Sequence, residues 1–146
     1  MIAFLKTLLI LIWILLLLPI QLLFVLINNN LRYKFPIFFH KGLLLILGVK
    51  LDIRGSLSKN RPLILLGNHC SYLDIIILSS TSRVCFVAKE EVRGWFLFGF
   101  LAKLQNTIFI SRTNVSTIDS IYKINSKINK NFSIILFPEA TTSKGK

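Results

Sequence analysis

Acidic residues are scarce in this chain. Its 146 residues include 6 Asp and Glu against 18 Lys and Arg, which gives a formal net charge of +12. Charged residues of both signs make up only 16% of the chain, whereas about a quarter is usual in a soluble domain. Hydrophobic residues reach 53%, and the mean hydropathy is +0.67. This composition argues against an ordinary soluble domain and indicates a membrane-associated protein.

Cysteines, metal-ligand clusters and basic stripes are also rare or missing. Cys70 and Cys85 are the only cysteines, so no disulfide framework is implied, and reduced thiols in a cytosol-facing domain are expected. His40 is isolated in an apolar stretch, and no metal site is expected. The cations are scattered between Lys6 and Lys146 among Leu and Ile runs. This scatter argues against nucleic acid and favours anionic membrane lipid as a partner.

The longest apolar run occupies residues 7–27, which carry no charge. A helix of this length would cross a hydrocarbon core of about 30 Å. Pro19 would kink the helix or split it into two half-segments in one leaflet, so a spanning helix and a hairpin both stay open. The run is longer than the apolar part of a signal peptide and lacks a small-residue cleavage pattern. Residues 1–30 are therefore expected to form an uncleaved membrane anchor.

The cations around this anchor indicate its orientation. Arg32, Lys34 and Lys41 follow it, whereas Lys6 alone precedes it. By the positive-inside rule, the remaining residues 31–146 are expected at the cell membrane on its cytoplasmic side.

Short apolar runs alternate with helical spacing along this second part. Strands are expected at residues 49–54, 62–67, 84–88, 107–110 and 134–137. Helices are expected at residues 35–47, 73–80, 94–104 and 115–128. The run at 62–67 has the pattern of a strand buried on both faces. The alternation predicts an α/β fold with a mostly parallel sheet and flanking helices, incomplete at the C-terminus because no helix follows the last strand.

Residues 93–103 place Trp95, Phe96, Phe98 and Phe100 among flanking cations. Such a composition is typical of elements that lie at the lipid headgroup level. Packing in a protein core explains it equally well, so both interpretations stay open.

Polar residues follow three of the apolar strands. After the first comes Asn68-His69-Cys70-Ser71-Tyr72-Leu73-Asp74, in which His69 and Asp74 have the chemistry of a general base and the carboxylate that orients it. Residues five apart point about 140° away from each other on an ideal helix, so His69 must lie in the loop or the first turn. A loop histidine with Asp74 merely starting a helix is at least as good an interpretation of this segment alone.

The other two junctions carry phosphate-binding and hydroxyl chemistry. Residues 106–112 end in Ser111 and Arg112, and an Arg emerging from a strand offers a planar fork for a phosphate. Residues 137–143 run from a strand into Glu139 and three hydroxyl side chains. A solvated strand end and a polar turn explain each one separately. Three such junctions together favour an active site at the carboxyl ends of the strands.

The three segments resemble the motifs of the glycerolipid (lysophospholipid) acyltransferases, typified by 1-acylglycerol-3-phosphate acyltransferase. Residues 68–74 match Asn-His-x-x-x-x-Asp. Residues 106–112 resemble Gly-x-x-Phe-Ile-x-Arg with Asn106 in place of Gly, and residues 137–143 resemble Phe-Pro-Glu-Gly-Thr-x-Ser with Ala140 in place of Gly. Their order and spacing cover residues 55–143. The fourth motif of the family, an apolar strand with a Pro, would lie beyond Lys146.

This resemblance implies that His69 takes the proton from the free hydroxyl of lysophosphatidic acid as that hydroxyl attacks an acyl thioester, while Asp74 orients the imidazole. It assigns the acceptor phosphate to Arg112. The further substrate-binding positions it implies are Asn68, Ser71, Phe109, Ser111, Pro138, Glu139, Ala140 and Thr141. The donor is acyl-CoA or an acyl carrier protein thioester, and no other cofactor and no metal is implied.

Three alternatives accompany this interpretation. In the first, the chain would be an inactive, truncated acyltransferase remnant that still inserts in the membrane, with a Cβ at Ala140 straining the third motif. In the second, Cys70 beside His69 would serve as a covalent nucleophile. In the third, the chain would be a small basic membrane protein whose three motifs arise by chance.

Overall fold

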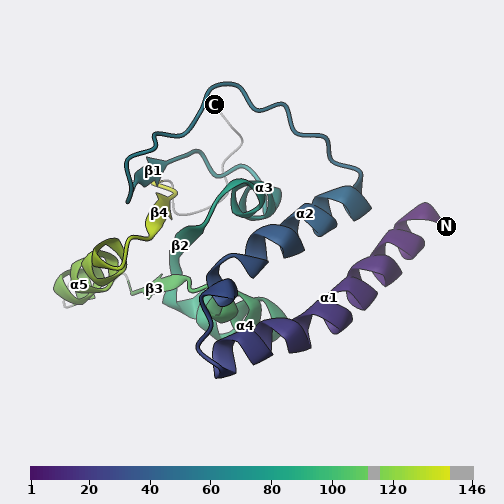
Figure 1. Cartoon of the computed structure of the whole chain (residues 1–146), viewed down its shortest axis with the longest axis horizontal. Helices are drawn as coiled ribbons and strands as arrows, with labels where there is room; N and C mark the ends of the chain where they lie inside the picture. Colours follow the sequence, from purple (N-terminus) through teal and green to yellow (C-terminus); the bar gives the residue numbers. More distant parts are fainter. Residues whose placement is uncertain (112–115, 139–146) are drawn as a thin grey trace. The chain divides into compact units, whose positions relative to one another are not determined.

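The computed structural model describes residues 1–111 and 116–138, with the side chains of residues 116 and 117 left aside (Figure 1). Internal contacts divide the chain into two compact units. The first unit comprises Met1–Gly55 and Ile75–Arg83, and the second comprises Ser56–Asp74 and Val84–Lys146.

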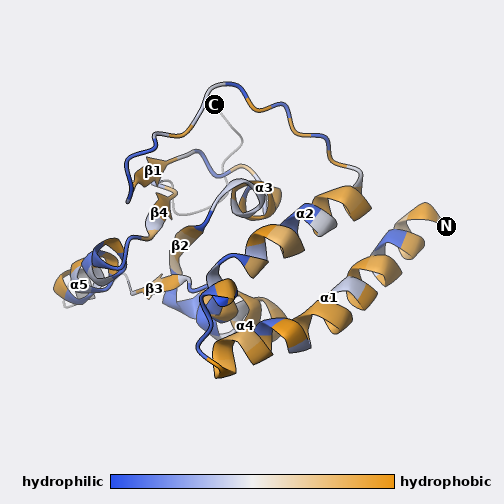
Figure 2. Ribbon diagram, viewed as in Figure 1, coloured by the Kyte–Doolittle hydropathy of each residue, from blue (hydrophilic) through white to orange (hydrophobic). Residues whose placement is uncertain are grey.

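The N-terminal part of the first unit, Met1–Gly55, contains two helices joined by a short 3-10 turn. α1 spans Ile2–Leu26, η1 spans Asn30–Tyr33, and α2 spans Phe35–Leu47. At 1.5 Å per residue, α1 is roughly 37 Å long. Among the described residues it is the one helix long and apolar enough to cross a membrane, judged by length and composition. Figure 2 shows the apolar residues extending along α1 from end to end.

α1 and α2 pack against each other as an antiparallel pair. The Trp13 ring lies directly over Gly42, where a Cβ would come within 2.1 Å of it. The Trp13 indole N–H donates to the Phe39 carbonyl at 3.0 Å. Near the start of α1, the Lys6 ammonium donates to the Leu47 carbonyl at the end of α2, at 2.7 Å. Such a cation favourably satisfies the free carbonyls of a helix C-terminus.

Of the alternatives left open at Pro19, a split into two half-segments is wrong, because α1 continues through it from Ile2 to Leu26. Side-chain contacts lie on both sides of the proline. Trp13 bonds to α2, and the Gln21 side-chain amide donates to the Arg32 carbonyl in η1 at 3.0 Å. The hairpin in this unit is therefore formed by α1 with α2, and not by two halves of α1.

The second unit is built on one sheet of four parallel strands, in the order β1-β4-β2-β3. The strands are β1 (Ile64–Leu66), β2 (Val84–Lys89), β3 (Ile108–Ile110) and β4 (Ser133–Leu136). β4 occupies a central position because its apolar run is buried on both faces, with Ile134 and Ile135 almost fully inaccessible. The predicted α/β fold with a mostly parallel sheet is confirmed.

Helices and turns connect these strands. α3 (Leu73–Thr81) begins in the second unit, η2 (Glu90–Gly94) and α4 (Phe96–Leu104) follow β2, and α5 (Ser116–Asn129) packs on β3 and β4. Asn106, two residues after the end of α4, has a left-handed φ of 69°. The Asn106 N–H bonds to the Lys103 carbonyl and the Thr107 N–H to the Ala102 carbonyl, each at 3.0 Å, which is the Schellman arrangement. Asn tolerates this conformation better than most residues, so it can stand where the family usually has Gly.

Two predictions about strands are wrong. Residues 49–54 form no strand, because their period-two pattern has no neighbouring strand to pair with and most of the segment is exposed. β1 is not buried on both faces, because it lies at the edge of the sheet beside β4. Ile64 and Leu66 remain 56% and 70% exposed there.

Candidate functional site

The site is built where β1 ends beside β4. The Gly67 N–H donates to the Leu136 carbonyl at 3.2 Å and so extends the pairing of the two strands by one residue. The chain then leaves the sheet at Asn68 and His69 and enters α3, whose first turn carries Asp74. This short path brings a histidine and a carboxylate together at the carboxyl edge of the sheet.

His69 and Asp74 lie within hydrogen-bonding distance, with Nδ1 of His69 3.0 Å from Oδ2 of Asp74. An ionised carboxylate only accepts hydrogen bonds, so Nδ1 donates, and in the neutral imidazole the lone pair lies on Nε2. The same Asp74 oxygen accepts the backbone N–H groups of Cys70 at 2.8 Å and Ser71 at 2.9 Å. Three donors therefore fix the carboxylate in place, and the carboxylate in turn fixes the imidazole tautomer.

The protonation of Asp74 follows from these contacts. Partial burial raises the pKa of Asp74, but the hydrogen bonds from the Ser71 N–H, from His69 and from the Cys70 N–H outweigh it. The pKa of Asp74 therefore lies below its ordinary value. The carboxylate stays ionised at neutral pH, as the orienting partner of a general base must.

Two phenylalanines set the plane of the imidazole ring. The His69 ring stacks on Phe137, which follows β4, with centroids 4.4 Å apart and planes 19° apart. Phe137 also stacks at 6.1 Å on Phe86 from β2. The sequence pattern gave Phe137 no role. Its position directly after the strand that pairs with β1 is the signal that would have found it.

The structure places the remaining predicted residues around this pair or away from it. Asn68 and Pro138 are exposed and each lies next in the chain to a ring of the stack. The Ser71 hydroxyl accepts the Leu73 N–H at 3.2 Å, so Ser71 stabilises the start of α3. Arg112, Glu139, Ala140 and Thr141 lie outside the described residues.

Phe109 and Ser111 lie on or after β3, which is separated from β1 by β4 and β2. Three strand spacings correspond to roughly 14 Å. The Phe109 side chain is buried, and Ser111 is partly buried at the carboxyl end of β3. β3 therefore ends at the same edge of the sheet as β1 but does not adjoin His69.

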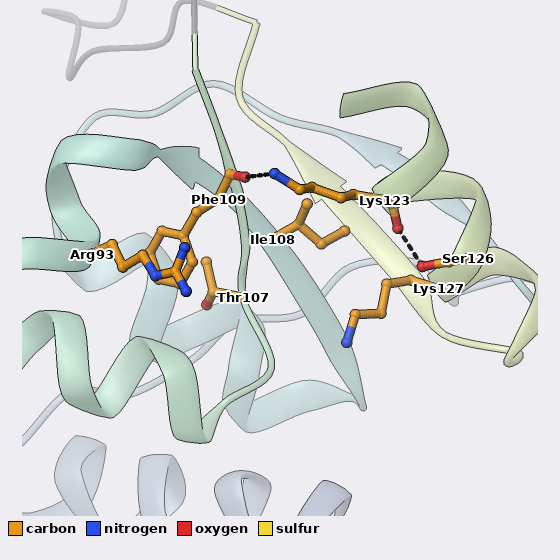
Figure 3. A pocket seen from close by; sticks show the side chains of 7 residues that line it. All are labelled: Arg93, Thr107, Ile108, Phe109, Lys123, Ser126 and Lys127. Atoms are coloured by element: carbon orange, nitrogen blue, oxygen red, sulfur yellow. Dashed lines mark hydrogen bonds between the residues drawn. The ribbon is translucent and has the colours of Figure 1, made fainter. Parts of the chain in front are cut away.

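A hollow of about 210 Å³ lies beside β3 and α5 (Figure 3). Its lining includes three cations, and two of them form ion pairs with carboxylates: Arg93 with Glu90 at 2.9 Å, and Lys123 with Asp119 at 2.7 Å. The third, Lys127, donates to the Asn106 side-chain oxygen. His69 and Asp74 do not line this hollow. Within residues 1–111 and 116–138, no group of three His, Cys, Asp or Glu side chains is placed to hold a metal ion.

Comparison with known proteins covers nearly all of the chain. Residues 49–146 match the model of the family described as Acyltransferase. A lyso-ornithine lipid O-acyltransferase of Rhizobium meliloti is 38% identical over 132 residues, which cover 90% of this chain and 45% of that protein. A 1-acyl-sn-glycerol-3-phosphate acyltransferase of Neisseria gonorrhoeae is 30% identical over 117 residues, which cover 78% of this chain and 46% of that protein.

A solved structure has the same fold. The 1-acyl-sn-glycerophosphate acyltransferase PlsC of Thermotoga maritima matches 98% of this chain and 64% of its own, with a TM-score of 0.67 and 24% identity. The chain spans about half the length of the relatives it matches. The matched residues include all three motifs; the first contains His69 and Asp74, and the third begins with the stacked Phe137. The resemblance inferred from the motifs is thus confirmed, and this chain belongs to the acyltransferase family.

Proposed function

We propose that this chain transfers a fatty acyl group from an acyl thioester to the free hydroxyl of a lysophospholipid, with lysophosphatidic acid as the acceptor. One observation carries the proposal: Nδ1 of His69 is held by the ionised Asp74, which leaves Nε2 as a base at the carboxyl edge of the sheet. Membership of the acyltransferase family supports the reaction class.

The proposed reaction needs no covalent intermediate on the protein. Nε2 of His69 takes the proton of the acceptor hydroxyl while its oxygen attacks the thioester carbonyl carbon. The tetrahedral intermediate collapses, the carbon–sulfur bond breaks, and the leaving thiolate takes the proton back from the imidazolium. Asp74 stabilises that imidazolium electrostatically and keeps its own charge throughout. The Phe137 ring keeps the imidazole from rotating out of line.

A lyso-ornithine lipid is a second candidate acceptor. Relatives of that name in Rhizobium meliloti and Brucella abortus are 38% and 37% identical to this chain, whereas the 1-acyl-sn-glycerol-3-phosphate acyltransferase of Neisseria gonorrhoeae is 30% identical. Arg112, which the motif assigns to the acceptor phosphate, favours lysophosphatidic acid. The two acceptors differ in their headgroup, so they can be compared directly.

Membrane association completes the proposal. α1 exposes apolar side chains along its length, and the cations that follow it favour the cytoplasmic side for the rest of the chain. On that side the site would receive a water-soluble donor, acyl-CoA or an acyl carrier protein thioester. The lipid acceptor would come from the bilayer that holds α1.

The test measures transfer of a labelled acyl group from acyl-CoA, and separately from acyl carrier protein, by membranes that contain the full chain. Lysophosphatidic acid and lyso-ornithine lipid are supplied in parallel. We expect transfer to lysophosphatidic acid, unchanged in Cys70→Ser because the thiol takes no part. Preferred acylation of lyso-ornithine lipid would contradict lysophosphatidic acid as the acceptor but would support the acyl-transfer reaction. Loss of transfer in Cys70→Ser with a labelled protein band in the unmodified chain would contradict the direct mechanism.

A folded, membrane-inserted chain that acylates neither acceptor from either donor would contradict the proposed activity. The family assignment would stand, and the chain would be an inactive remnant.

A further inference from the structure

Four aromatic side chains on α4 and the residue before it are exposed. Trp95, Phe96, Phe98 and Phe100 have exposed fractions of 44%, 99%, 67% and 39%. We refer to these four residues as the aromatic surface. Large exposed aromatics in one short segment are unusual on a soluble protein and mark a contact surface. The four side chains do not pack in the core of the described chain, which favours the interpretation as an interaction surface.

The exposure follows from how α4 is held. Among the described elements, η2 is the one whose backbone closely approaches that of α4. The contact centres on the buried Gly99, where a Cβ would lie 2.5 Å from the Arg93 carbonyl oxygen and 2.7 Å from that of Val92. The two backbones thus touch through a glycine, and no large side chain is needed to fill the contact. The aromatic side chains of α4 remain outside it.

Cations flank the aromatic surface on both sides. Arg93 precedes it and is exposed, with its guanidinium paired to Glu90 at 2.9 Å. Lys103 is exposed in the last turn of α4 and has no carboxylate partner among the described residues. A tryptophan and phenylalanines between cations have the composition of elements that lie at the headgroup level of an anionic bilayer. The net charge of +12 acts in the same direction.

A second exposed apolar group lacks this character and serves as a reference. Ile118, Ile121 and Tyr122 on α5 are 81%, 53% and 76% exposed. The charges between and beside them, Asp119 and Lys123, form an ion pair at 2.7 Å, as Arg93 and Glu90 do at 2.9 Å beside the aromatic surface. No tryptophan is present there, and Tyr122 is the one aromatic residue of the three. Exposure is therefore similar at the two places, but aromatic content differs.

We propose that the aromatic surface is a second membrane contact, in which Trp95, Phe96 and Phe98 enter the boundary between headgroups and acyl chains while Arg93 and Lys103 face anionic phosphates. It belongs to the unit that carries His69 and Asp74, whereas α1 belongs to the other unit. The contact itself does not depend on the proposed acyl transfer. Its consequence for that reaction, that the catalytic unit is held at the bilayer that contains the acceptor, rests on the proposed function.

Tryptophan fluorescence tests the contact directly, because Trp13 and Trp95 are the only tryptophans. The full chain is reconstituted in phosphatidylglycerol–phosphatidylcholine vesicles, and its emission is compared with that of Trp95→Phe to isolate the share of Trp95. We expect that share to be blue-shifted, quenched by lipids brominated near the headgroup end of the acyl chain, and protected from aqueous iodide. Iodide quenching with no effect of brominated lipid would overturn the proposal.

A pair of variants separates the aromatic surface from general apolar exposure. Phe96→Ser with Phe98→Ser removes two side chains that make few contacts in the protein, so the fold is expected to persist, as far-ultraviolet circular dichroism checks. Trp95 emission should shift to the red and lose its brominated-lipid quenching. Ile118→Ser with Ile121→Ser on α5 should leave both unchanged. An equal loss in the α5 variant, or no loss in the α4 variant, would contradict the assignment.

Lys103→Gln tests the electrostatic part. It should weaken brominated-lipid quenching of Trp95 in anionic vesicles and leave it unchanged in vesicles of phosphatidylcholine alone. An equal effect in both kinds of vesicle would contradict the pairing of this cation with anionic phosphate.

Discussion

The two units of this chain differ in what they bury and in what they expose. In the first unit, Gln21 and His40 are buried as well as Leu17, Leu43 and Leu44, while much of the Leu and Ile of α1 is exposed. In the second unit, Cys85, Ile134 and Ile135 are almost fully buried within a parallel sheet. Buried polar groups and an apolar exterior are expected of a protein surrounded by lipid, whereas an apolar core is expected of a protein surrounded by water. The difference agrees with a chain that combines the proposed membrane helix with the sheet that carries the candidate site.

The units also differ in what their polar contacts do. In the first unit, side chains satisfy backbone carbonyls: Lys6 bonds to Leu47, Trp13 to Phe39 and Gln21 to Arg32. These contacts hold helices together. In the second unit, backbone N–H groups satisfy a side chain, since Cys70 and Ser71 donate to Asp74. The second arrangement fits the charged group of the proposed site, and the first fits a helical pair in the proposed apolar surrounding.

The largest effect is expected in the second unit from Asp74→Asn. The amide keeps the size of the carboxylate but no longer favours the proton on Nδ1 or stabilises an imidazolium. Acyl transfer to lysophosphatidic acid should fall by about 10²–10⁴-fold, measured as kcat, with the sheet intact by circular dichroism. A loss under threefold would show that Asp74 serves the start of α3 and not the base.

The next effect falls on the first unit. Gly42→Ala places a methyl group against the Trp13 ring, where the Cβ would lie 2.1 Å away. Overpacking of this kind costs about 1–3 kcal/mol, and the helical pair should melt earlier in detergent micelles while the acyl-transfer site keeps its geometry. Gly94→Ala is the matched control, because nothing lies within 4 Å of a Cβ there. Equal melting temperatures of the two variants would contradict the close contact between Trp13 and Gly42.

A smaller effect is expected from Asn106→Ala at the end of α4. The backbone there has a left-handed φ of 69°. Alanine in this conformation, without the local hydrogen bonds that an Asn side chain makes, should lower the free energy of unfolding by about 1–2 kcal/mol. The side chain also bonds to Lys127 and lies 3.7 Å from the Cys85 sulfur. Asn106→Gly relieves the backbone and loses only the side-chain contacts, so urea unfolding of the two variants separates the two causes. Equal destabilisation would assign the effect to the side chain.

The smallest effect concerns pH. Because the folded pKa of Asp74 lies below its ordinary value of 3.8, the ionised carboxylate contributes stability that is fully present above that value. The contribution is lost as the pH falls through the lower, folded pKa. The stability of the unmodified chain should therefore fall more steeply than that of Asp74→Asn below about pH 4. Parallel curves in urea unfolding would contradict the hydrogen bonds assigned to this carboxylate.

The local sequence pattern was sufficient to predict an element where its apolar residues alone indicate a strand or a helix. The alternation of apolar runs predicted the four strands of the sheet, and the junction after residues 62–67 predicted that His69 and Asp74 could meet. The loop position argued for His69 is the one observed. Residues 49–54 show the limit, because a period-two pattern does not reveal whether a neighbouring strand is available.

Other features depend on tertiary neighbours that no local pattern shows. Whether Ile64 and Leu66 are exposed depends on the position of β1 at the edge, and the contacts of α1 with α2 and η1 are tertiary ones. The role of Phe137 requires knowing that β4 pairs with β1. The exposure of Phe96 and Phe98 requires knowing that α4 packs on η2 through a glycine.

The central claim, that Nε2 of His69 is the base of an acyl transfer, is tested most directly by His69→Ala. Membranes that contain equal amounts of the full chain and of this variant are supplied with labelled acyl-CoA and lysophosphatidic acid. The account predicts transfer by the unmodified chain and a loss of about 10²–10⁴-fold in the variant. Equal transfer by both proteins would contradict it.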